Sequence, residues 1–511
     1  MNKNNNKTLI PPIIFCVIAY IYDLVFLFRY GRGIIDSDLA AEMVLAKLKM
    51  PFPHIFINPD WFYSTELRVV NMIGFYKIGL LFSPNNWDTA RNIGMAIALL
   101  LLVLVMWSIA RDLGFEREGL WAAGMSLLPV GFWYMIQSIY GGYYLAHALV
   151  SLGALWGIIK MCTSKKKYMI IIGAVISYGL AFLSGMQGIR HSMVMFAPLL
   201  VAAIIVKKKN LKFYNYSLIA FLLNAIGLFI NIAVLGNFYS FQAQEQVTWA
   251  EGNGSLLTSF RWYVEGFGFS QNYKYGYFNE PQDVKLLSFN GIAIGLGLVM
   301  CAVVIASMVI LIVKFKKLSD WEQILVVLTF SMIAIMCVVY SYIYGMSSYW
   351  QQTMPFGYFL IVLAIRHFDF KEAKYEFYTF CTIAAMILIC STGTCSAYIK
   401  DPFVAEPGLA RVSEFLLNET DYREGYSIFW LSNTLMYMSD GQIDVYTAVG
   451  SPDDLTLNKW LQRTDHFGNE PQSHFFVLTY STPEQKSSTN LADLGAELIY
   501  DDGSYCVFAV E

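Results

Sequence analysis

The chain has 511 residues, of which 56% are hydrophobic and only 14% are charged, and its formal net charge at pH 7 is −3. With a mean hydropathy of +0.48, it has too few polar side chains to cover a water-soluble surface of this size. The composition therefore excludes a soluble globular protein and predicts an α-helical polytopic membrane protein.

Apolar runs long enough to cross a bilayer as a helix recur through the first four hundred positions, and we expect about eleven spans. They fall near residues 9–29, 91–110, 119–136, 143–161, 168–186, 192–206, 214–236, 286–313, 321–344, 355–366 and 377–398. The first run is longer than the core of a secretory signal, and no small-x-small cleavage site precedes Gly31. We therefore interpret it as an uncleaved anchor.

Positive charge marks alternate loops, and short loops that stay in the cytoplasm carry the excess of Lys and Arg. Such clusters occur at 111–117, 160–167, 207–212, 314–317 and 366–374. The loops at 137–142 and 345–354 have no Lys or Arg, and the loop at 187–191 has only Arg190. The pattern predicts a cytoplasmic amino terminus. It places the carboxyl-terminal segment and the long loops 30–90 and 237–285 on the outer face of the cell membrane.

The composition changes after Lys400, so we expect a transmembrane domain over 1–399 and a soluble extracytoplasmic domain over 400–511. This last segment contains six Lys or Arg residues and eighteen Asp or Glu residues. Helical periodicity covers 409–417, and strand patterns cover 426–429, 443–449, 474–480, 497–500 and 505–510. These patterns predict a small α/β domain. Its acidic charge excludes nucleic acid as a partner.

Two acids open the first outer loop, in the sequence Asp36-Ser37-Asp38. Each of these three residues is also a good N-cap for the helix that the following residues favour, and Leu39, Met43 and Ala46 share a face that suits a membrane interface. The functional interpretation needs one carboxylate to face a cleft and act as a general base. One acid would then cap the helix while the other removes a proton from a hydroxyl group.

The chain here resembles the GT-C superfamily of polytopic glycosyltransferases, including protein O-mannosyltransferases and aminoarabinose transferases. The resemblance rests on a first span that enters from the cytoplasm and on a large first outer loop that opens with an Asp-x-Asp motif. Many further spans and an outer carboxyl-terminal domain extend it. It implies transfer of a sugar from a polyprenyl-phosphate donor to a glycan, lipid or protein acceptor, with Asp36 or Asp38 as the catalytic base.

One departure from this family concerns metal. Relatives of the oligosaccharyltransferase type carry a second acidic motif in the next outer loop, which helps to bind a divalent cation. This chain has Gln137-Ser138-Ile139-Tyr140-Gly141-Gly142 at that place, without a carboxylate. A metal-dependent mechanism is therefore in doubt, we assign no metal ligands, and monophosphate donors are favoured over diphosphate donors.

Polar and aromatic residues elsewhere on the predicted outer side are candidates for substrate binding. Each has a structural alternative: a helix start or interfacial anchor for the first-loop residues, a headgroup contact for the arginine at 190, and an aromatic belt for the loop 237–285. An arginine on the outer side opposes the charge rule, and it would bind a lipid phosphate bidentately. The candidates are His54, Tyr63, Glu66, His147, Arg190, His191, Arg261 and Trp262.

Two other classes of function compete with the glycosyltransferase hypothesis. A transporter or flippase of lipid-linked saccharides also needs many spans and a polar vestibule, but it tends to place ionisable groups near the midplane. These spans carry almost none. The one acid well inside a predicted span is Asp23, which either belongs to the same cleft as Asp36 or pairs with Arg29 or a tyrosine hydroxyl, and we favour the second alternative. A non-catalytic scaffold would tolerate replacement of Asp36, Asp38 and Arg190.

Overall fold

The computed structural model describes residues 9–49, 56–206, 210–241, 255–268, 284–343, 345–400 and 408–511. The chain divides into two compact units. The helical unit contains residues 1–26, 96–233 and 245–397, and the loop-sheet unit contains residues 27–95, 234–244 and 398–511. The first loop and the carboxyl-terminal segment therefore belong to one unit.

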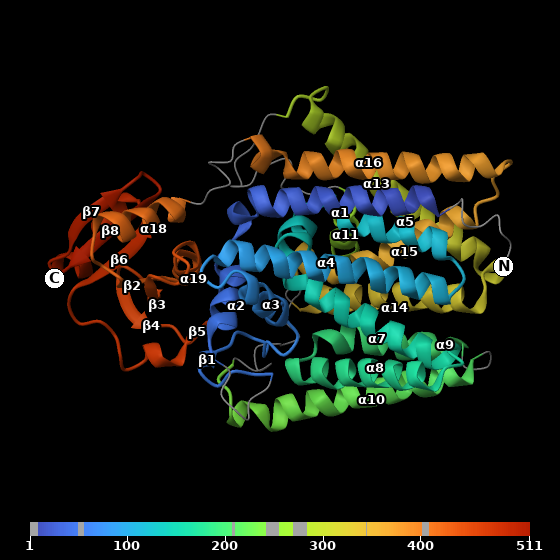
Figure 1. The fold of residues 1–511 in the computed structure, drawn as a ribbon, viewed down its shortest axis with the longest axis horizontal. Coiled ribbons are helices and arrows are strands. Elements are labelled where there is room, and N and C mark those ends of the chain that lie inside the picture. The colour runs from blue at the N-terminus through green and yellow to red at the C-terminus, as the bar shows by residue number, and fades with distance from the viewer. Residues whose placement is uncertain are drawn as a thin grey trace. The chain divides into compact units, whose positions relative to one another are not determined.

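Among the described residues, eight helices are long and apolar enough to cross a membrane. They are α1 (Ile10–Tyr30), α4 (Trp87–Asp112), α7 (Tyr143–Thr163), α8 (Lys167–Gln187), α10 (Leu211–Ala233), α13 (Phe289–Lys314), α14 (Asp320–Tyr342) and α16 (Ala373–Lys400) (Figure 1). Apolar side chains on their surfaces are exposed, including Val175 at 67%, Phe229 at 67% and Val313 at 75%. Such surfaces are suited to lipid, and the chain is a multi-pass membrane protein.

Three of the eleven predicted spans differ from single long helices. The span predicted at 119–136 bends by 90° between α5 (Glu116–Leu127) and the helix over Phe132–Ile139, because Pro129 lies at the break and cannot donate a backbone hydrogen bond. Helix α9 (Ala197–Val206) follows a π-helical turn over Ser192–Phe196, and α15 (Met354–Arg366) has only 13 residues. Every residue of α15 from Met354 to Ile365 is buried, so its apolar sequence reflects a protein core.

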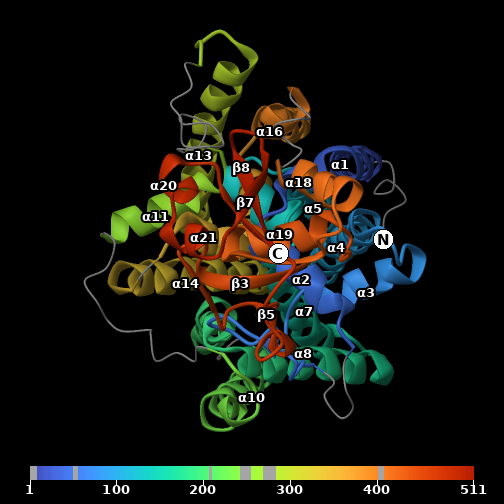
Figure 2. The same cartoon turned by 90° about the vertical axis from the view of Figure 1, so that its left-hand side faces the viewer.

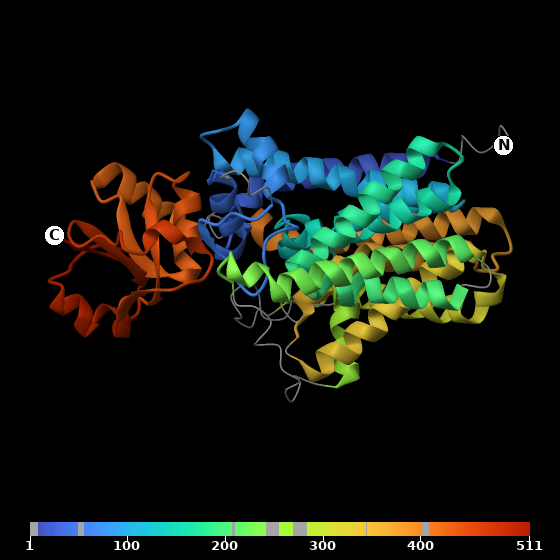
Figure 3. The same cartoon turned by 90° about the horizontal axis from the view of Figure 1, so that it is seen from below.

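Small residues allow three helices of the helical unit to approach closely. A Cβ atom added to Gly157 of α7 would lie 2.4 Å from the Gly173 carbonyl oxygen of α8, and one added to Gly227 of α10 would lie 2.3 Å from the Phe182 carbonyl oxygen of α8. Helices α8 and α10 accordingly run side by side in Figures 1 and 3. Close backbone contact of this kind is the usual way in which helices pack within membranes.

The loop-sheet unit combines the first loop with a mixed sheet. The first loop forms α2 (Ser37–Lys47), β1 (Trp61–Phe62) and α3 (Ile73–Phe82). The remaining elements are α18 (Gly408–Glu419), β2 (Glu424–Ile428), α19 (Phe429–Met438), β3 (Asp444–Gly450), β4 (Asp454–Leu457), β5 (Gln462–Arg463), β6 (Phe475–Tyr480), α20 (Pro483–Lys486), α21 (Thr489–Asp493), β7 (Glu497–Asp501) and β8 (Tyr505–Val510).

Six strands form one sheet in the order β4-β3-β2-β6-β8-β7 (Figure 1). Strand β2 pairs in parallel with β3 and β6, and the other pairings are antiparallel. One face packs into a core of Tyr426, Tyr446, Phe475, Val477, Leu491, Cys506, Phe508 and Val510. The five predicted strands and the helix near 409–417 are present, so the predicted fold class, helices with a small carboxyl-terminal α/β domain, is confirmed.

Candidate active site

Asp36 is the N-cap of α2. Its backbone is extended, with φ −107° and ψ −179°, and its Oδ1 accepts a hydrogen bond from the Leu39 amide at 3.0 Å. A capping side chain satisfies one of the amides that a helix start leaves without an intrahelical partner. Asp38 lies in the first turn, where the helix dipole favours negative charge. Both acids are therefore held at the same end of α2.

The surroundings of these two acids favour their protonated forms. Both side chains are half-buried. Burial raises the pKa of Asp36 to about 7, with a further contribution from the negative charge of Asp38, while bonds from backbone amides and the charge of Arg91 oppose the rise. Burial also raises the pKa of Asp38, and the charge of Arg68 opposes that rise. Interacting acids titrate as a pair, so this pair can take up one proton near neutral pH.

A third acid and two arginines surround the pair. Glu42 follows Asp38 by four residues and so lies on the same face of α2. Its Oε1 forms an ion pair with Arg68 Nη1 at 3.1 Å, and both side chains are buried. Arg91, which is 1% exposed, interacts with the charges of Asp36 and Glu42 and hydrogen-bonds with the Tyr76 hydroxyl. Two fixed positive charges therefore offset three acids.

A second polar cluster lies in the helical unit, where α7 begins and α8 ends. Arg190 Nη1 donates to the Tyr144 hydroxyl at 3.2 Å, and the guanidinium carbon lies 5.3 Å from the centroid of that ring and 5.7 Å from that of Tyr349. The Nδ1 atom of His147 and the Nε2 atom of His191 are 3.4 Å apart, and both rings are buried. Three predicted binding residues, Arg190, His191 and His147, are thus brought together.

Local geometry explains how this second cluster forms. Gly188 ends α8 with φ +150°, a conformation that L side chains rarely adopt, and the chain turns within a few residues. The π-helical turn over Ser192–Phe196 follows directly, and Ser192 Oγ donates to Asn224 Oδ1 at 2.6 Å. Wide turns of this type are frequent at functional sites, because they aim side chains away from the regular helical positions.

The structure describes four of the five other predicted binding residues. Tyr63 is buried, and its hydroxyl accepts a hydrogen bond from the Asn58 amide of the same loop at 2.7 Å. Glu66 is half-buried in the same loop, and His54 lies outside the described residues. On α11 (Leu256–Glu265), Arg261 forms an ion pair with Glu265 at 3.1 Å, and Trp262 is half-buried.

Sequence reasoning missed Glu42 and Arg91. A signal for Glu42 was present, because a single acid within the apolar run Leu39–Ala46 must be paired if the run is buried. Arg91 begins an apolar span, where the sequence alone does not distinguish a headgroup contact from a buried partner of an acid. The effect of Arg91 on Asp36 and Glu42 depends on tertiary interactions between segments that are far apart in the sequence.

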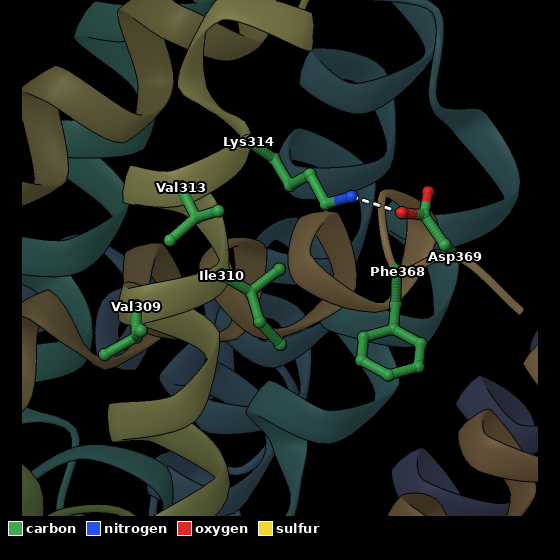
Figure 4. A pocket seen from close by; sticks show the side chains of 6 residues that line it. All are labelled: Val309, Ile310, Val313, Lys314, Phe368 and Asp369. Atoms are coloured by element: carbon green, nitrogen blue, oxygen red, sulfur yellow. Dashed lines mark hydrogen bonds and ion pairs between the residues drawn. The ribbon is translucent and has the colours of Figure 1, made fainter.

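A cavity of about 260 Å³ lies elsewhere in the helical unit, at the carboxyl end of α13 (Figure 4). Its lining is mainly apolar, with an ion pair between Lys314 and Asp369 at the edge. The residues that line it are Val309, Ile310, Val313, Lys314, Phe368 and Asp369. None of the predicted site residues contributes to this cavity.

Within the described residues, no group of three or more His, Cys, Asp or Glu side chains is arranged to hold a metal ion.

Comparison with known proteins identifies the fold. No family model and no curated protein sequence matches the chain. The crystal structure of ArnT from Cupriavidus metallidurans in the apo state matches it with a TM-score of 0.57 and 11% identity, over 97% of each chain. This chain has the ArnT fold. ArnT bound to undecaprenyl phosphate matches over the same shares, with a TM-score of 0.56 and 11% identity.

A third structure is less similar. The archaeal oligosaccharyltransferase AglB from Archaeoglobus fulgidus, in complex with an inhibitory peptide and a dolichol-phosphate, matches with a TM-score of 0.45 and 12% identity. The match covers 85% of this chain and 64% of AglB. ArnT is an aminoarabinose transferase of the GT-C type, so the expected resemblance to GT-C enzymes is confirmed for the fold.

Proposed function

We propose that this protein is a membrane glycosyltransferase that moves a sugar from a polyprenyl-phosphate donor to a hydroxyl group of an acceptor. The observation that carries the proposal is the ArnT fold, shared over 97% of both chains, together with two half-buried carboxyl groups at the start of the first loop helix. The similar structure of ArnT with undecaprenyl phosphate supports a lipid phosphate as the carrier. The acceptor is a glycan, lipid or protein that carries a free hydroxyl group.

The acid pair supplies the base in this reaction. The ionised carboxylate of Asp36 or Asp38 takes the proton from the acceptor hydroxyl as its oxygen attacks the anomeric carbon of the donor sugar. The bond from that carbon to the phosphate oxygen breaks, and the electron pair leaves with the lipid phosphate. Attack opposite the leaving group inverts the anomeric configuration. A pKa of about 7 for Asp36 suits a base that works near neutral pH.

The cluster of Arg190, His147 and His191 is proposed to bind the lipid phosphate. A guanidinium group remains charged at any physiological pH and binds phosphate oxygens bidentately. Two aromatic rings hold this guanidinium, which reduces the entropy lost when it binds an anion. We propose that five further residues contribute to binding of the donor or the acceptor, namely His54, Tyr63, Glu66, Arg261 and Trp262. We also propose that the amino terminus is cytoplasmic and the sheet is on the outer face.

The experiment that tests the function measures transfer of labelled sugar from a polyprenyl-phosphate donor by the purified full-length protein. The variants Asp36→Asn and Asp38→Asn are compared with wild type. We expect the transfer rate of the variant that lacks the base to fall by about 10²- to 10⁴-fold. At position 36 the Asn side chain retains the capping bond, and the folding of both variants is checked in parallel. Full activity of both variants would contradict the assignment of the base, and absence of transfer by wild type would contradict the enzymatic function.

A transporter of lipid-linked saccharides is the second candidate, and one observation favours it. Asp23 of α1 is fully buried within a span; one carboxylate oxygen accepts from the Tyr140 hydroxyl at 3.1 Å, and the other has no hydrogen-bond partner among the described residues. Buried acids within spans often belong to ion pathways. Movement of intact donor lipid across vesicles by wild type, without transfer of sugar, would favour this candidate. A scaffold would be favoured if wild type showed neither transfer nor transport and the protein tolerated replacement of Asp36, Asp38 and Arg190.

A further inference from the structure

Helix α19 of the carboxyl-terminal segment packs along α2, the helix that carries the acid pair (Figures 1 and 2). Every residue of α2 from Leu39 to Ala46 is buried. On α19, every residue from Leu431 to Met438 is buried as well. The face of α2 that the sequence placed at a membrane interface is therefore covered by protein. An isolated helix of 11 residues is marginal in water, so α2 depends on such packing for its order.

A hydrogen bond fixes the start of α2 to the start of α19. Ser37, which lies between the two acids, is fully buried, and its Oγ donates to the Phe429 carbonyl oxygen. A buried hydroxyl that loses its partner pays the full cost of desolvation, so the bond strongly favours one position of Ser37. Because Asp36 and Asp38 are its immediate neighbours, the same bond restrains both carboxyl groups.

Further bonds fix the other end of α19 to the ends of the first loop. The Tyr437 hydroxyl donates to Asp88 Oδ1 at 2.7 Å, and the Trp87 amide donates to Asp440 Oδ1 at 2.7 Å. Arg32 forms an ion pair with Asp88 at 3.1 Å and donates from Nη2 to the Met438 carbonyl oxygen at 3.0 Å. The residues before α2 and those at the start of α4 are thus joined through one short helix.

A small two-stranded sheet adds a third attachment. Strand β1 of the first loop pairs antiparallel with β5, with Trp61 opposite Arg463 and Phe62 opposite Gln462. The Thr464 amide extends the ladder by donating to the Asp60 carbonyl oxygen at 3.1 Å. Backbone pairing depends little on side-chain identity, so this attachment persists when single side chains at α19 are changed.

We infer that α19 positions the acid pair, so that Ser37 and Tyr437 are positioning residues for the transfer reaction and the carboxyl-terminal segment is a functional part of the first loop. The inference rests on the proposed function, since it assigns the acids a task in transfer. Misplacement of a reacting group by about 1 Å costs up to about 100-fold in rate. Side chains that hold α2 in place therefore affect catalysis without touching the substrate.

The test compares Ser37→Ala and Tyr437→Phe with the control Tyr446→Phe in the full-length protein. Tyr437 and Tyr446 are both buried, and each hydroxyl donates a hydrogen bond. The Tyr446 hydroxyl donates to the Asn469 carbonyl oxygen at 3.0 Å, so this bond lies within the segment 408–511. We expect kcat to fall by up to about 100-fold in Ser37→Ala and by less in Tyr437→Phe, with KM for the donor unchanged. The control should retain the rate of wild type.

Two further measurements separate positioning from a loss of folded protein. A loosened α2 admits water to the acids, so the acidic limb of the kcat profile should shift to lower pH in Ser37→Ala, which a smaller folded fraction would not cause. Hydrogen exchange of the amides at 40–47 should be faster in Ser37→Ala and Tyr437→Phe than in wild type and Tyr446→Phe. Unchanged exchange and unchanged kcat in an active protein would overturn the inference. If wild type transfers no sugar, the proposed function fails, and the exchange rates alone decide whether α19 orders α2.

Discussion

Asp36 combines a structural and a chemical task in one side chain. Its Oδ1 caps α2, while burial and the charge of Asp38 raise its pKa to about 7. A carboxylate that only capped a helix would gain from being ionised, because negative charge at a helix start is stabilising. The raised pKa means that desolvation and repulsion outweigh this gain. Such a cost in stability is common where a side chain is held ready for chemistry.

The raised pKa of Asp36 predicts a pH-dependent loss of stability. In the unfolded chain the carboxyl group has its ordinary pKa of 3.8, so between about pH 4 and pH 7 the folded state retains a proton that the unfolded state has lost. Folding stability from this group therefore falls as the pH rises through this range. Asp36→Asn keeps the cap and removes the charge, so its apparent Tm should exceed that of wild type at pH 8, and the difference should shrink toward pH 4. A variant that melts below wild type at every pH would contradict this expectation.

The two acids were accessible to sequence reasoning, but their environment was not. An Asp-Ser-Asp motif after an apolar run predicts both a helix cap and a candidate base, and Asp36 takes the capping position. Arg68 and Arg91 come from other segments of the loop-sheet unit, at 30 and 53 residues after Asp38 in the sequence. Their effect on the acids depends on tertiary contacts, which no local pattern encodes.

At the scale of elements, the ion pair of Glu42 and Arg68 joins α2 to the segment that precedes α3. Both side chains are buried, at 3% and 4% exposure. A buried charge that loses its partner is strongly unfavourable, whereas replacement of both charges by neutral groups is often tolerated. The pair therefore fixes the register of α2 in the loop more than it adds to net stability.

Removal of one member of this pair should destabilise the loop-sheet unit. We expect Arg68→Met to cost about 3 to 5 kcal/mol in the free energy of unfolding, because the buried carboxylate of Glu42 loses the partner of its ion pair. The double variant Glu42→Gln with Arg68→Met should recover most of this loss. Arg411→Met is a matched control, because the Arg411 side chain is 52% exposed in its ion pair with Asp502, and such a pair should contribute less than about 1 kcal/mol. Equal losses in Arg68→Met and Arg411→Met, measured by denaturant unfolding in detergent, would contradict the argument.

Helix α19 shows which elements sequence patterns find and which they miss. The strands β2, β3, β6, β7 and β8 alternate or run apolar between turn residues, and they were predicted. In α19 the sequence Phe429-Trp430-Leu431-Ser432-Asn433-Thr434-Leu435-Met436-Tyr437-Met438 lacks a polar stripe, because α2 and the sheet bury it on more than one side. Periodicity then gives no signal. For the same reason α15, in which every residue from Met354 to Ile365 is buried, has no polar stripe.

At the scale of the molecule, the distribution of Lys and Arg predicts the orientation in the membrane. The loops that follow α4, α7, α13 and α15 carry these residues, whereas residues 137–142 before α7 and residues 345–354 before and at the start of α15 include no Lys or Arg. A phosphatase reporter that needs disulfide bonds is active only outside the cytoplasm. Fusions after Gly114 and Lys317 should therefore be inactive, and a fusion after Glu511 should be active. The opposite pattern would reverse the proposed orientation, and with it the side on which sugar is transferred.

The sequence predicted the overall architecture of the molecule better than it predicted which segments form each compact unit. Length and hydropathy predicted a polytopic protein, and the change in composition after Lys400 predicted a second domain at the carboxyl end. The association of residues 27–95 with residues 398–511 in one compact unit was not foreseen. It depends on contacts such as that of Ser37 with Phe429, between segments whose separate sequences contain no sign of each other.

The bond between Ser37 and Phe429 joins residues that are 392 positions apart, which has a consequence for biogenesis. At about 5 to 20 residues per second, roughly 20 to 80 s of synthesis separate the emergence of the two partners. During that interval the start of α2 lacks the helix that later covers it. If the protein has the proposed function, a chain that ends before Phe429 lacks the helix that covers α2 and should transfer sugar more slowly than the full chain.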